Sequence, residues 1–337
     1  MGEAARQRLG QWLAAHLPGV AGAPDVEPIA GGQSNPTFFV TRGDQRMVLR
    51  KQPPNVMPSA HAIDREYRIM GALADSGIPV PTMLAYCEDR DVLGTPFYVM
   101  ERVEGRVFGE CWLPGVSADD RRAMVLDMAL VLARLHGVDW TGLGLGDFGR
   151  QGQYFERQIA RWTKQWQLSK TAESADIDFL LGWLPAHIPT EDITTIAHGD
   201  FRIGNLMFHP SEPRVVAVLD WELSTLGHPL ADVAYSALGW HLRPDEYMGM
   251  MGMEDVAPGI PDESAYLECY YQAVPAIPQV LPFHYAFSLF RLAVIFEGIS
   301  ARARTGASHS ANAADVGKLG AGFARRAVEQ ALRTPTS

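Results

Sequence analysis

Hydrophobic and polar positions change their spacing part-way along the chain. From about residue 28 to residue 103, short apolar stretches alternate with glycine, proline and charged positions, a pattern typical of strands joined by tight turns. Gly43-Asp44 supplies turn residues between two of these stretches, which favours a hairpin. The pattern predicts strands over Pro28–Ala30, Thr37–Val40, Arg46–Lys51 and Thr95–Val103.

Helical spacing marks the start of the chain and most of the sequence after Gly105. Leu9, Trp12, Leu13 and Leu17 share one face of a predicted amphipathic helix. Further helices are predicted over Ala62–Ser76, Ala118–His136, Glu263–Val274, His284–Ala303 and Ala311–Leu332. We therefore expect an α+β protein with a small antiparallel-sheet lobe, residues 1–104, and a larger, mostly helical lobe, residues 105–337.

Composition and charge exclude several classes of protein. The 337 residues carry 29 Lys and Arg against 39 Asp and Glu, a net charge of -10, which disfavours binding to the nucleic-acid backbone. Cys87, Cys111 and Cys269 show no CxxC spacing, so we expect buried free thiols rather than disulfides or a zinc site. Neither a secretory leader nor an apolar run of the ~18 residues that span a membrane is apparent. We expect a cytoplasmic protein without nucleic-acid or membrane partners.

The most informative stretch is IAHGDFRIGNLMF, residues 196–208, followed by VVAVLDWE, residues 215–222. Two short apolar strands flank a polar loop. This arrangement can bring the side chains of Asp200, Asn205 and Asp220 together at one site. Oxygen ligands without a His or Cys cluster suit a hard cation such as Mg²⁺, which is normally shared with phosphates.

The spacing His-x-Asp-x-x-x-x-Asn matches the catalytic loop of kinase-type phosphoryl-transfer enzymes. In such loops the Asp accepts the proton of the acceptor hydroxyl and the Asn holds a metal ion. Asp220, twenty positions after Asp200, matches the second metal-holding Asp. The candidate catalytic residues are therefore Asp200, with His198 and Arg202 of the same loop, and the candidate metal ligands are Asn205 and Asp220.

Upstream elements fit nucleotide binding. A loop between two predicted strands has backbone N–H groups that can cover a triphosphate, although ordinary hairpins also use glycine pairs; it comprises Gly31, Gly32, Gln33, Ser34 and Asn35. Strand alternation places Val48 with Arg50 and Leu49 with Lys51. We favour Arg50 as the phosphate-facing cation and keep Lys51 as the alternative. Glu66 on the next helix can hold that cation, or it is a solvated carboxylate beside Arg65.

One tripeptide, Asp147-Phe148-Gly149, spells the metal-binding signature of protein kinases. It precedes the predicted catalytic loop and follows Gly142, Gly144 and Gly146, with no strand before it. This context predicts a glycine-rich loop instead.

Together these motifs resemble the aminoglycoside phosphotransferase and choline kinase family, relatives of protein kinases that phosphorylate small molecules. The match runs from about Glu27 to Tyr235 and includes GGQSN, VLRK, REYRIMGAL, YVMERVEG, HGDFRIGN and LDWE. The resemblance implies a two-lobed protein-kinase-like fold, Mg²⁺, and ATP, with GTP as the alternative. It also implies adenine contacts by the Glu101 carbonyl and the Val103 N–H, with Met100 behind the base, and a buried Asp232 bracing the catalytic loop.

Three positions depart from related patterns. Gly199 stands where protein kinases prefer Arg, Trp221-Glu222 replaces the usual Phe-Gly, and Arg50 stands where many relatives have Lys. Arg is always charged and can bind phosphate through two nitrogens, so the last change is compatible with function but makes the pairing with Glu66 less secure.

The acceptor is suggested by an insert, YFERQIARWTKQW, residues 154–166. Arg157, Arg161 and Lys164 recur there at helical spacing with Trp162 and Trp166. With VLRKQPP and LDWELSTLGHPLADVAY, the insert resembles the branch whose animal members are fused to acyl-CoA dehydrogenases. That resemblance implies a hydroxyacyl acceptor, such as a hydroxyacyl-CoA, and a functional link to an acyl-CoA dehydrogenase. A solvated helix face with Trp in the core is the alternative interpretation of the insert.

These patterns predict a kinase that transfers the γ-phosphoryl group of ATP to a hydroxyl of a small molecule. The alternatives are a catalytically inactive nucleotide-binding regulatory module and an aminoglycoside-type antibiotic kinase, for which carboxylates rather than the cationic insert would be expected. An acyl-CoA dehydrogenase is excluded because no segment resembles a flavin-binding fold. The oligomeric state stays open.

Overall fold

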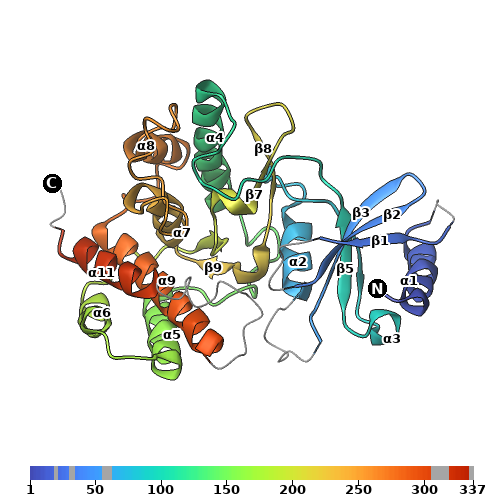
Figure 1. Cartoon of the computed structure of the whole chain (residues 1–337), viewed down its shortest axis with the longest axis horizontal. Coiled ribbons are helices and arrows are strands. Elements are labelled where there is room, and N and C mark those ends of the chain that lie inside the picture. Colours follow the sequence, from blue (N-terminus) through green and yellow to red (C-terminus); the bar gives the residue numbers. More distant parts are fainter. Residues whose placement is uncertain (19–21, 30–34, 55–62, 305–318, 334–337) are drawn as a thin grey trace. The chain divides into compact units, whose positions relative to one another are not determined.

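The computed structural model describes residues 1–18, 22–29, 35–54, 63–304 and 319–333, which form two compact units (Figure 1). The first unit comprises Met1–Val107, Asp139–Phe148 and Asn205–Ser224, and the second comprises Phe108–Val138, Gly149–Gly204 and Thr225–Ser337. Two later segments thus pack with the N-terminal residues. The predicted linear boundary between residues 104 and 105 stays a prediction.

The first unit is built on a five-stranded antiparallel sheet. Its strand order is β1-β2-β3-β5-β4. The predicted strands over Thr37–Val40, Arg46–Lys51 and Thr95–Val103 are present, whereas the first strand shares only Pro28 with the prediction, Ala30 lies outside the described residues, and β4 was not predicted. The strands are β1 (Asp25–Pro28), β2 (Thr37–Arg42), β3 (Gln45–Lys51), β4 (Met83–Cys87) and β5 (Phe97–Glu101).

The two faces of this sheet have different surroundings, because successive side chains along a strand point to opposite faces. Met47 and Leu49 of β3 are buried in an apolar core with Leu9 and Leu13 of α1 (Glu3–His16) and with α3 (Arg90–Leu93). Figure 1 shows α2 (Ile63–Leu73) on the other side of the sheet. Arg50 is therefore directed away from the apolar core.

A hairpin and a short helical turn complete the first unit. Strands β7 (Leu206–Phe208) and β8 (Val215–Val218) pair antiparallel, and η2 (Trp221–Leu223) comes after them. The η1 turn (Ile203–Asn205) leads into β7, so the predicted catalytic loop continues directly into this hairpin.

The second unit is mostly helical, with a two-stranded antiparallel sheet of β6 and β9. Helix α9 is buried along most of its length and packs against α5, α7 and α11. Residues 311–318 of the last predicted helix lie outside the described residues. The elements are α4 (Ala118–His136), α5 (Tyr154–Ser169), α6 (Ala175–Ala186), β6 (Thr195–Ala197), β9 (Thr225–Gly227), α7 (Pro229–Ala237), η3 (Leu238–His241), α8 (Glu263–Ala273), α9 (Pro282–Arg304) and α11 (Leu319–Ala331).

Among the described helices, none combines the length and the apolar character needed to cross a membrane.

We predict that Gly105→Ala destabilises the first unit and that Gly71→Ala stabilises it. A methyl group on Gly105 would lie 2.6 Å from the Phe208 carbonyl oxygen and would also overlap the Met207 side chain, within a backbone ladder that Arg106 forms with Phe208. Such overpacking costs roughly 1–3 kcal/mol. Gly71 is exposed in α2 with no heavy atom within 4 Å of the added methyl, so alanine should gain about 0.5–1 kcal/mol. Urea unfolding measures both changes, and equal stability of the two variants would contradict this packing.

Candidate active site

In the first unit, an arginine joins two acidic side chains from distant parts of the chain. Arg50 Nε on β3 lies 3.0 Å from Glu66 Oε2 on α2, and Arg50 Nη2 lies 2.9 Å from Asp220 Oδ1, after β8. The Glu66 side chain is 1% exposed and that of Arg50 is 16% exposed. The expected contact between Arg50 and Glu66 is therefore present.

Glu66 accepts two further hydrogen bonds. Asn35 Nδ2 donates to Oε1 at 2.7 Å, and the Tyr98 hydroxyl donates to Oε2 at 3.0 Å. Tyr98 pairs with Arg50 across β3 and β5, which explains why both reach the same carboxylate. Burial raises the pKa of Glu66 to about 7, although Arg50 and Tyr98 act in the opposite direction. Burial disfavours the charge on Arg50, but the charge of Glu66 and the contacts with Tyr98 and Asp220 keep its pKa above the usual value.

Lys51 lies on the opposite face of β3. Its Nζ donates to the Leu93 carbonyl at 2.8 Å, and burial lowers its pKa. The geometry therefore groups Arg50, rather than Lys51, with the acidic residues.

Asn205 and Asp220 are brought together by the β7–β8 hairpin. The backbone N–H of Leu219 donates to the Asn205 carbonyl at 2.8 Å, which places Asp220 one residue beyond this contact. Asp220 has a φ of 65°, a left-handed conformation that is costly for a residue other than glycine and often marks functional sites.

An amide oxygen and a carboxylate are donors suited to Mg²⁺ rather than to zinc. In the part of the chain that the structure describes, no group of three or more His, Cys, Asp and Glu side chains is placed to hold a metal. Asn205 and Asp220 offer donor types that the predicted cation would need, and its remaining ligands would come from water and phosphate.

In the second unit, a buried carboxylate holds the predicted catalytic loop. Asp232 on α7 accepts hydrogen bonds from the backbone N–H groups of His198 at 2.6 Å and Gly199 at 2.9 Å. Gly199 has a φ of 84°, which explains glycine at this position. Burial would raise the pKa of Asp232, but contacts with His136, His198 and Gly199 outweigh it, so the pKa lies below its usual value.

Asp200 is held at both carboxylate oxygens. The Tyr235 hydroxyl donates to Oδ1 at 2.5 Å, and Arg202 Nε lies 3.4 Å from Oδ2. The side chains of Asp200 and Arg202 are 18% and 24% exposed. His198 is fully buried, and its Nδ1 accepts from the Asp200 backbone N–H at 3.2 Å, so it shapes the loop from within.

Several predicted site residues stay predictions. Gly31, Gly32, Gln33 and Ser34 lie outside the described residues, whereas Asn35 is buried against Glu66. The convergence of Asp200 with Asn205 and Asp220 is untested, because Asp200 belongs to the second unit and the other two belong to the first. The adenine contacts stay predictions as well; Met100 and Glu101 end β5, and Val103 lies just after them.

The kinase-like tripeptide at residue 147 lies in a loop, and its residues contact α2. Asp147 forms an ion pair with Arg68, and Arg65 Nη2 donates to the carbonyls of Phe148 at 2.6 Å and Ser224 at 3.2 Å. This loop anchors the helix that carries Glu66.

The predicted insert forms α5. Its Trp166 is buried, Arg161 and Lys164 are exposed, and Arg157 and Trp162 are half-buried. The guanidinium carbons of Arg161 and Arg291 lie 5.3 and 5.7 Å from the centre of the Trp162 ring system, within the range of cation–π attraction.

Sequence patterns missed three side chains at these sites. Tyr98 and Tyr235 donate to Glu66 and Asp200, and Arg291 donates to the Gly199 carbonyl. The spacing of Tyr235 three positions after Asp232 was an available signal, because residues at i and i+3 share a helix face.

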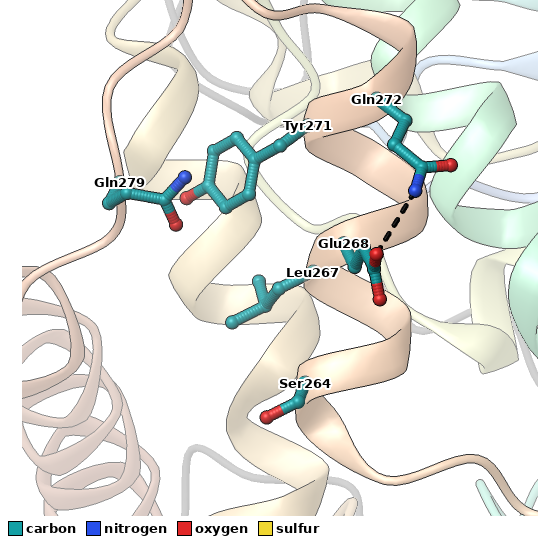
Figure 2. Close-up of a pocket in the computed structure, with 6 residues that line it drawn as sticks. All are labelled: Ser264, Leu267, Glu268, Tyr271, Gln272 and Gln279. Carbon is teal, nitrogen blue, oxygen red and sulfur yellow. Dashed lines mark hydrogen bonds between the residues drawn. The ribbon is translucent and has the colours of Figure 1, made fainter.

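A separate surface pocket of about 450 Å³ lies along α8. Figure 2 shows its lining residues, and Gln272 Nε2 donates to Glu268 Oε1 at 3.1 Å. The pocket contains none of the predicted site residues, and it is lined by Ser264, Leu267, Glu268, Tyr271, Gln272 and Gln279.

Comparison with known proteins identifies the family. The model of the phosphotransferase enzyme family, APH, matches residues 25–269. The chain belongs to the phosphotransferase enzyme family. A crystal structure from Ralstonia eutropha, described as that of a "putative aminoglycoside phosphotransferase", is 46% identical with a TM-score of 0.90, and the match covers 98% of this chain and 99% of that one.

One curated relative and a second solved structure are also similar to this chain. Mouse acyl-CoA dehydrogenase family member 10 is 44% identical over 318 residues, which cover 91% of this chain but 30% of that protein. The chain thus spans less than a third of the length of this relative. A thermostable mutant of aminoglycoside phosphotransferase APH(4)-Ia, solved with ADP and hygromycin B, is 15% identical with a TM-score of 0.64 over 97% of this chain and 99% of that one, and shows the fold alone.

The comparisons confirm three predictions: the kinase-like α+β fold, the phosphotransferase family, and the resemblance to the branch named for acyl-CoA dehydrogenases.

We predict that Glu66→Gln changes how stability depends on pH. A buried carboxyl with a pKa of about 7 holds its proton in the folded state between pH 4.5 and 7, whereas the unfolded chain has released it. The stability of the wild type relative to the variant should therefore fall as pH rises from 4.5 to about 7, and level off above that. Urea unfolding at a series of pH values measures this difference. Glu104→Gln, at an exposed ion pair with Arg46, is the matched control and should show no such trend; a flat difference for Glu66→Gln would contradict the prediction.

Proposed function

We propose that this chain is a small-molecule kinase that transfers the γ-phosphoryl group of ATP, or alternatively GTP, to a substrate hydroxyl. The observation that carries the proposal is the order His198, Asp200, Asn205 and Asp220 in a member of the phosphotransferase family, with Asp232 holding the backbone at His198 and Gly199. Phosphoryl transfer needs positioning and charge stabilisation more than covalent help from the protein. Residues of the two units divide these tasks between them.

Residues of the first unit serve the nucleotide. The Arg50 guanidinium, fixed by Glu66 and Asp220, binds phosphate oxygens, and the backbone of residues 31–35 covers them. Glu101 and Val103 contact adenine, with Met100 behind it. Asn205 and Asp220 hold Mg²⁺. Asp220 can do so while Oδ1 accepts from Arg50, because a carboxylate has two oxygens with several acceptor sites. Bound Mg²⁺ supplies neutralisation of the charge on the phosphate oxygens.

Residues of the second unit serve the acceptor. Asp200 orients the acceptor hydroxyl and accepts its proton as the hydroxyl oxygen bonds to the γ-phosphorus and the bond from that phosphorus to the nucleoside diphosphate breaks. Arg202 lies close enough to balance the charge of Asp200. His198 contributes by holding the loop rather than by touching substrate.

We further propose a hydroxyacyl acceptor, with its CoA thioester as the preferred form, and a functional link to an acyl-CoA dehydrogenase. Two observations support the class. Arg157, Arg161 and Lys164 give α5 a cationic face suited to an anionic acceptor in a protein of net charge -10. The relatives that match most of the chain are named as acyl-CoA dehydrogenase family members.

Asp200→Asn should lower kcat by roughly 10²–10⁴-fold, the usual contribution of a general base. Nucleotide affinity should be nearly unchanged because Asp200 meets the acceptor rather than the nucleotide. A coupled ADP assay measures turnover, and calorimetry with and without Mg²⁺ measures affinity. Asp119→Asn, at an exposed position of α4, is the matched control and should retain activity. Full activity of Asp200→Asn would show that the base is misassigned.

We expect hydroxyacyl-CoA thioesters to give the highest kcat/KM in a panel with free hydroxy acids, amino alcohols and aminoglycosides. Arg161→Gln should raise the KM for the thioester about tenfold, the effect of losing roughly 1.4 kcal/mol of a charged contact. Arg325→Gln, on exposed α11 surface, is the control with the same change of charge. Preference for aminoglycosides would overturn the acceptor class, and nucleotide binding without transfer to any acceptor would favour an inactive regulatory module.

A further inference from the structure

Tyr235 makes an unequal environment for the two oxygens of Asp200. Its hydroxyl donates to Oδ1 at 2.5 Å, a short hydrogen bond, whereas Arg202 Nε lies 3.4 Å from Oδ2, near the limit for a hydrogen bond. Rotation of the carboxylate by half a turn would exchange these partners. Since the two oxygens are chemically equivalent, such a rotation restores the same arrangement, and the tighter contact therefore holds one oxygen position against Tyr235 and leaves the other beside Arg202.

Tyr247 completes a ring of four side chains with Tyr235, Asp200 and Arg202. Its side chain hydrogen-bonds with Tyr235, and its ring centre lies 5.4 Å from the Arg202 guanidinium carbon. Its φ of 76° is unfavourable for a bulky residue, so the surrounding structure must hold it there. The adjacent Glu246 is fixed by an ion pair with Arg326 of α11.

Tyr235 is suited to act as a permanent donor. Its side chain is buried, and burial together with the charge of Asp200 raises its pKa well above the usual value. The guanidinium carbon of Arg291 lies 5.3 Å from the Tyr235 ring centre, and the same arginine donates to the Gly199 carbonyl. The phenol is thus fixed to the loop whose carboxylate it contacts.

We propose that Tyr235 is a positioning residue that occupies Oδ1 of Asp200 and thereby directs Oδ2 toward the acceptor hydroxyl. The weaker contact of Arg202 with Oδ2 is the one that an arriving hydroxyl can replace or share. This inference rests on the proposed function, because it assigns the oxygen that Asp200 uses as base. Tyr235 itself touches neither substrate nor nucleotide.

The experiment compares Tyr235→Phe with Tyr266→Phe. Tyr266 is also buried, and its hydroxyl hydrogen-bonds at 2.8 Å to Ser236 Oγ, the residue next to Tyr235 on α7. Each variant removes the hydroxyl of one buried tyrosine, Tyr235 on α7 itself and Tyr266 packed against α7, but only Tyr235→Phe releases Asp200. We expect Tyr235→Phe to lower kcat by roughly 10–100-fold, in line with the cost of misplacing a reacting group, with the KM for nucleotide unchanged. Tyr266→Phe should keep kcat close to that of the wild type, and equal kcat losses in the two variants would overturn the proposal.

A double variant separates this proposal from the proposed function. If Tyr235 acts through Asp200, then Tyr235→Phe should lower the single-turnover rate no further in the Asp200→Asn background. The same fold loss in both backgrounds would overturn the positioning role. Wild-type turnover by Asp200→Asn alone would instead overturn the proposed function.

Tyr247→Phe provides a variant with little risk to folding, because Tyr247 is 41% exposed. Loss of its hydroxyl loosens Tyr235 without removing it, so we expect a smaller fall in kcat, with the KM for nucleotide again unchanged. A fall larger than that of Tyr235→Phe would contradict the order of contacts in the ring.

Discussion

A carboxylate without access to water has to be surrounded by donors, and Asp232 meets this constraint by fixing the backbone of the loop that carries the candidate chemistry. Its oxygens accept the N–H groups of His198 and Gly199, and His136 Nε2 lies 3.5 Å away. Removal of these donors would leave a buried charge, which costs several kcal/mol. The conformation of the loop is therefore tied to the stability of the helical unit, and the placement of Asp200 depends on it.

In the first unit, a buried charge is likewise stabilised by its partners, but here the central group is the positively charged Arg50 and its partners are carboxylates. A guanidinium is flat and presents donors along two edges, so Arg50 can contact Glu66 through Nε and Asp220 through Nη2 at once. A lysine ammonium offers a single point of charge on a flexible stem and would not connect two carboxylates with the same geometry. The departure at this strand position thus agrees with the pairing instead of weakening it. Asn35 and Tyr98 complete the environment of Glu66.

Local patterns predicted what depends on local geometry. Strand alternation correctly separated Arg50 from Lys51, and helical periodicity gave the bounds of α4. Contacts that depend on strand register or on packing between distant segments were not predictable: Tyr98 reaches Glu66 through the register of β5 against β3, and Tyr235 reaches Asp200 through the placement of α7. The roles of the predicted site residues are assigned by chemistry and family resemblance, and they stay proposals.

Arg65 and Arg68 restrict the movement of α2, the helix that carries Glu66. They attach α2 to the loop at Asp147-Phe148 and to the Ser224 carbonyl, all within one compact unit. A hydrogen bond from a charged donor that is partly buried, as Arg65 is, contributes about 1.5–3 kcal/mol, whereas the exposed pair of Arg68 with Asp147 adds little. Displacement of the helix would break several such contacts as well as the pairing with Arg50. For the kinase proposed above, this attachment would keep Glu66 in place to hold Arg50.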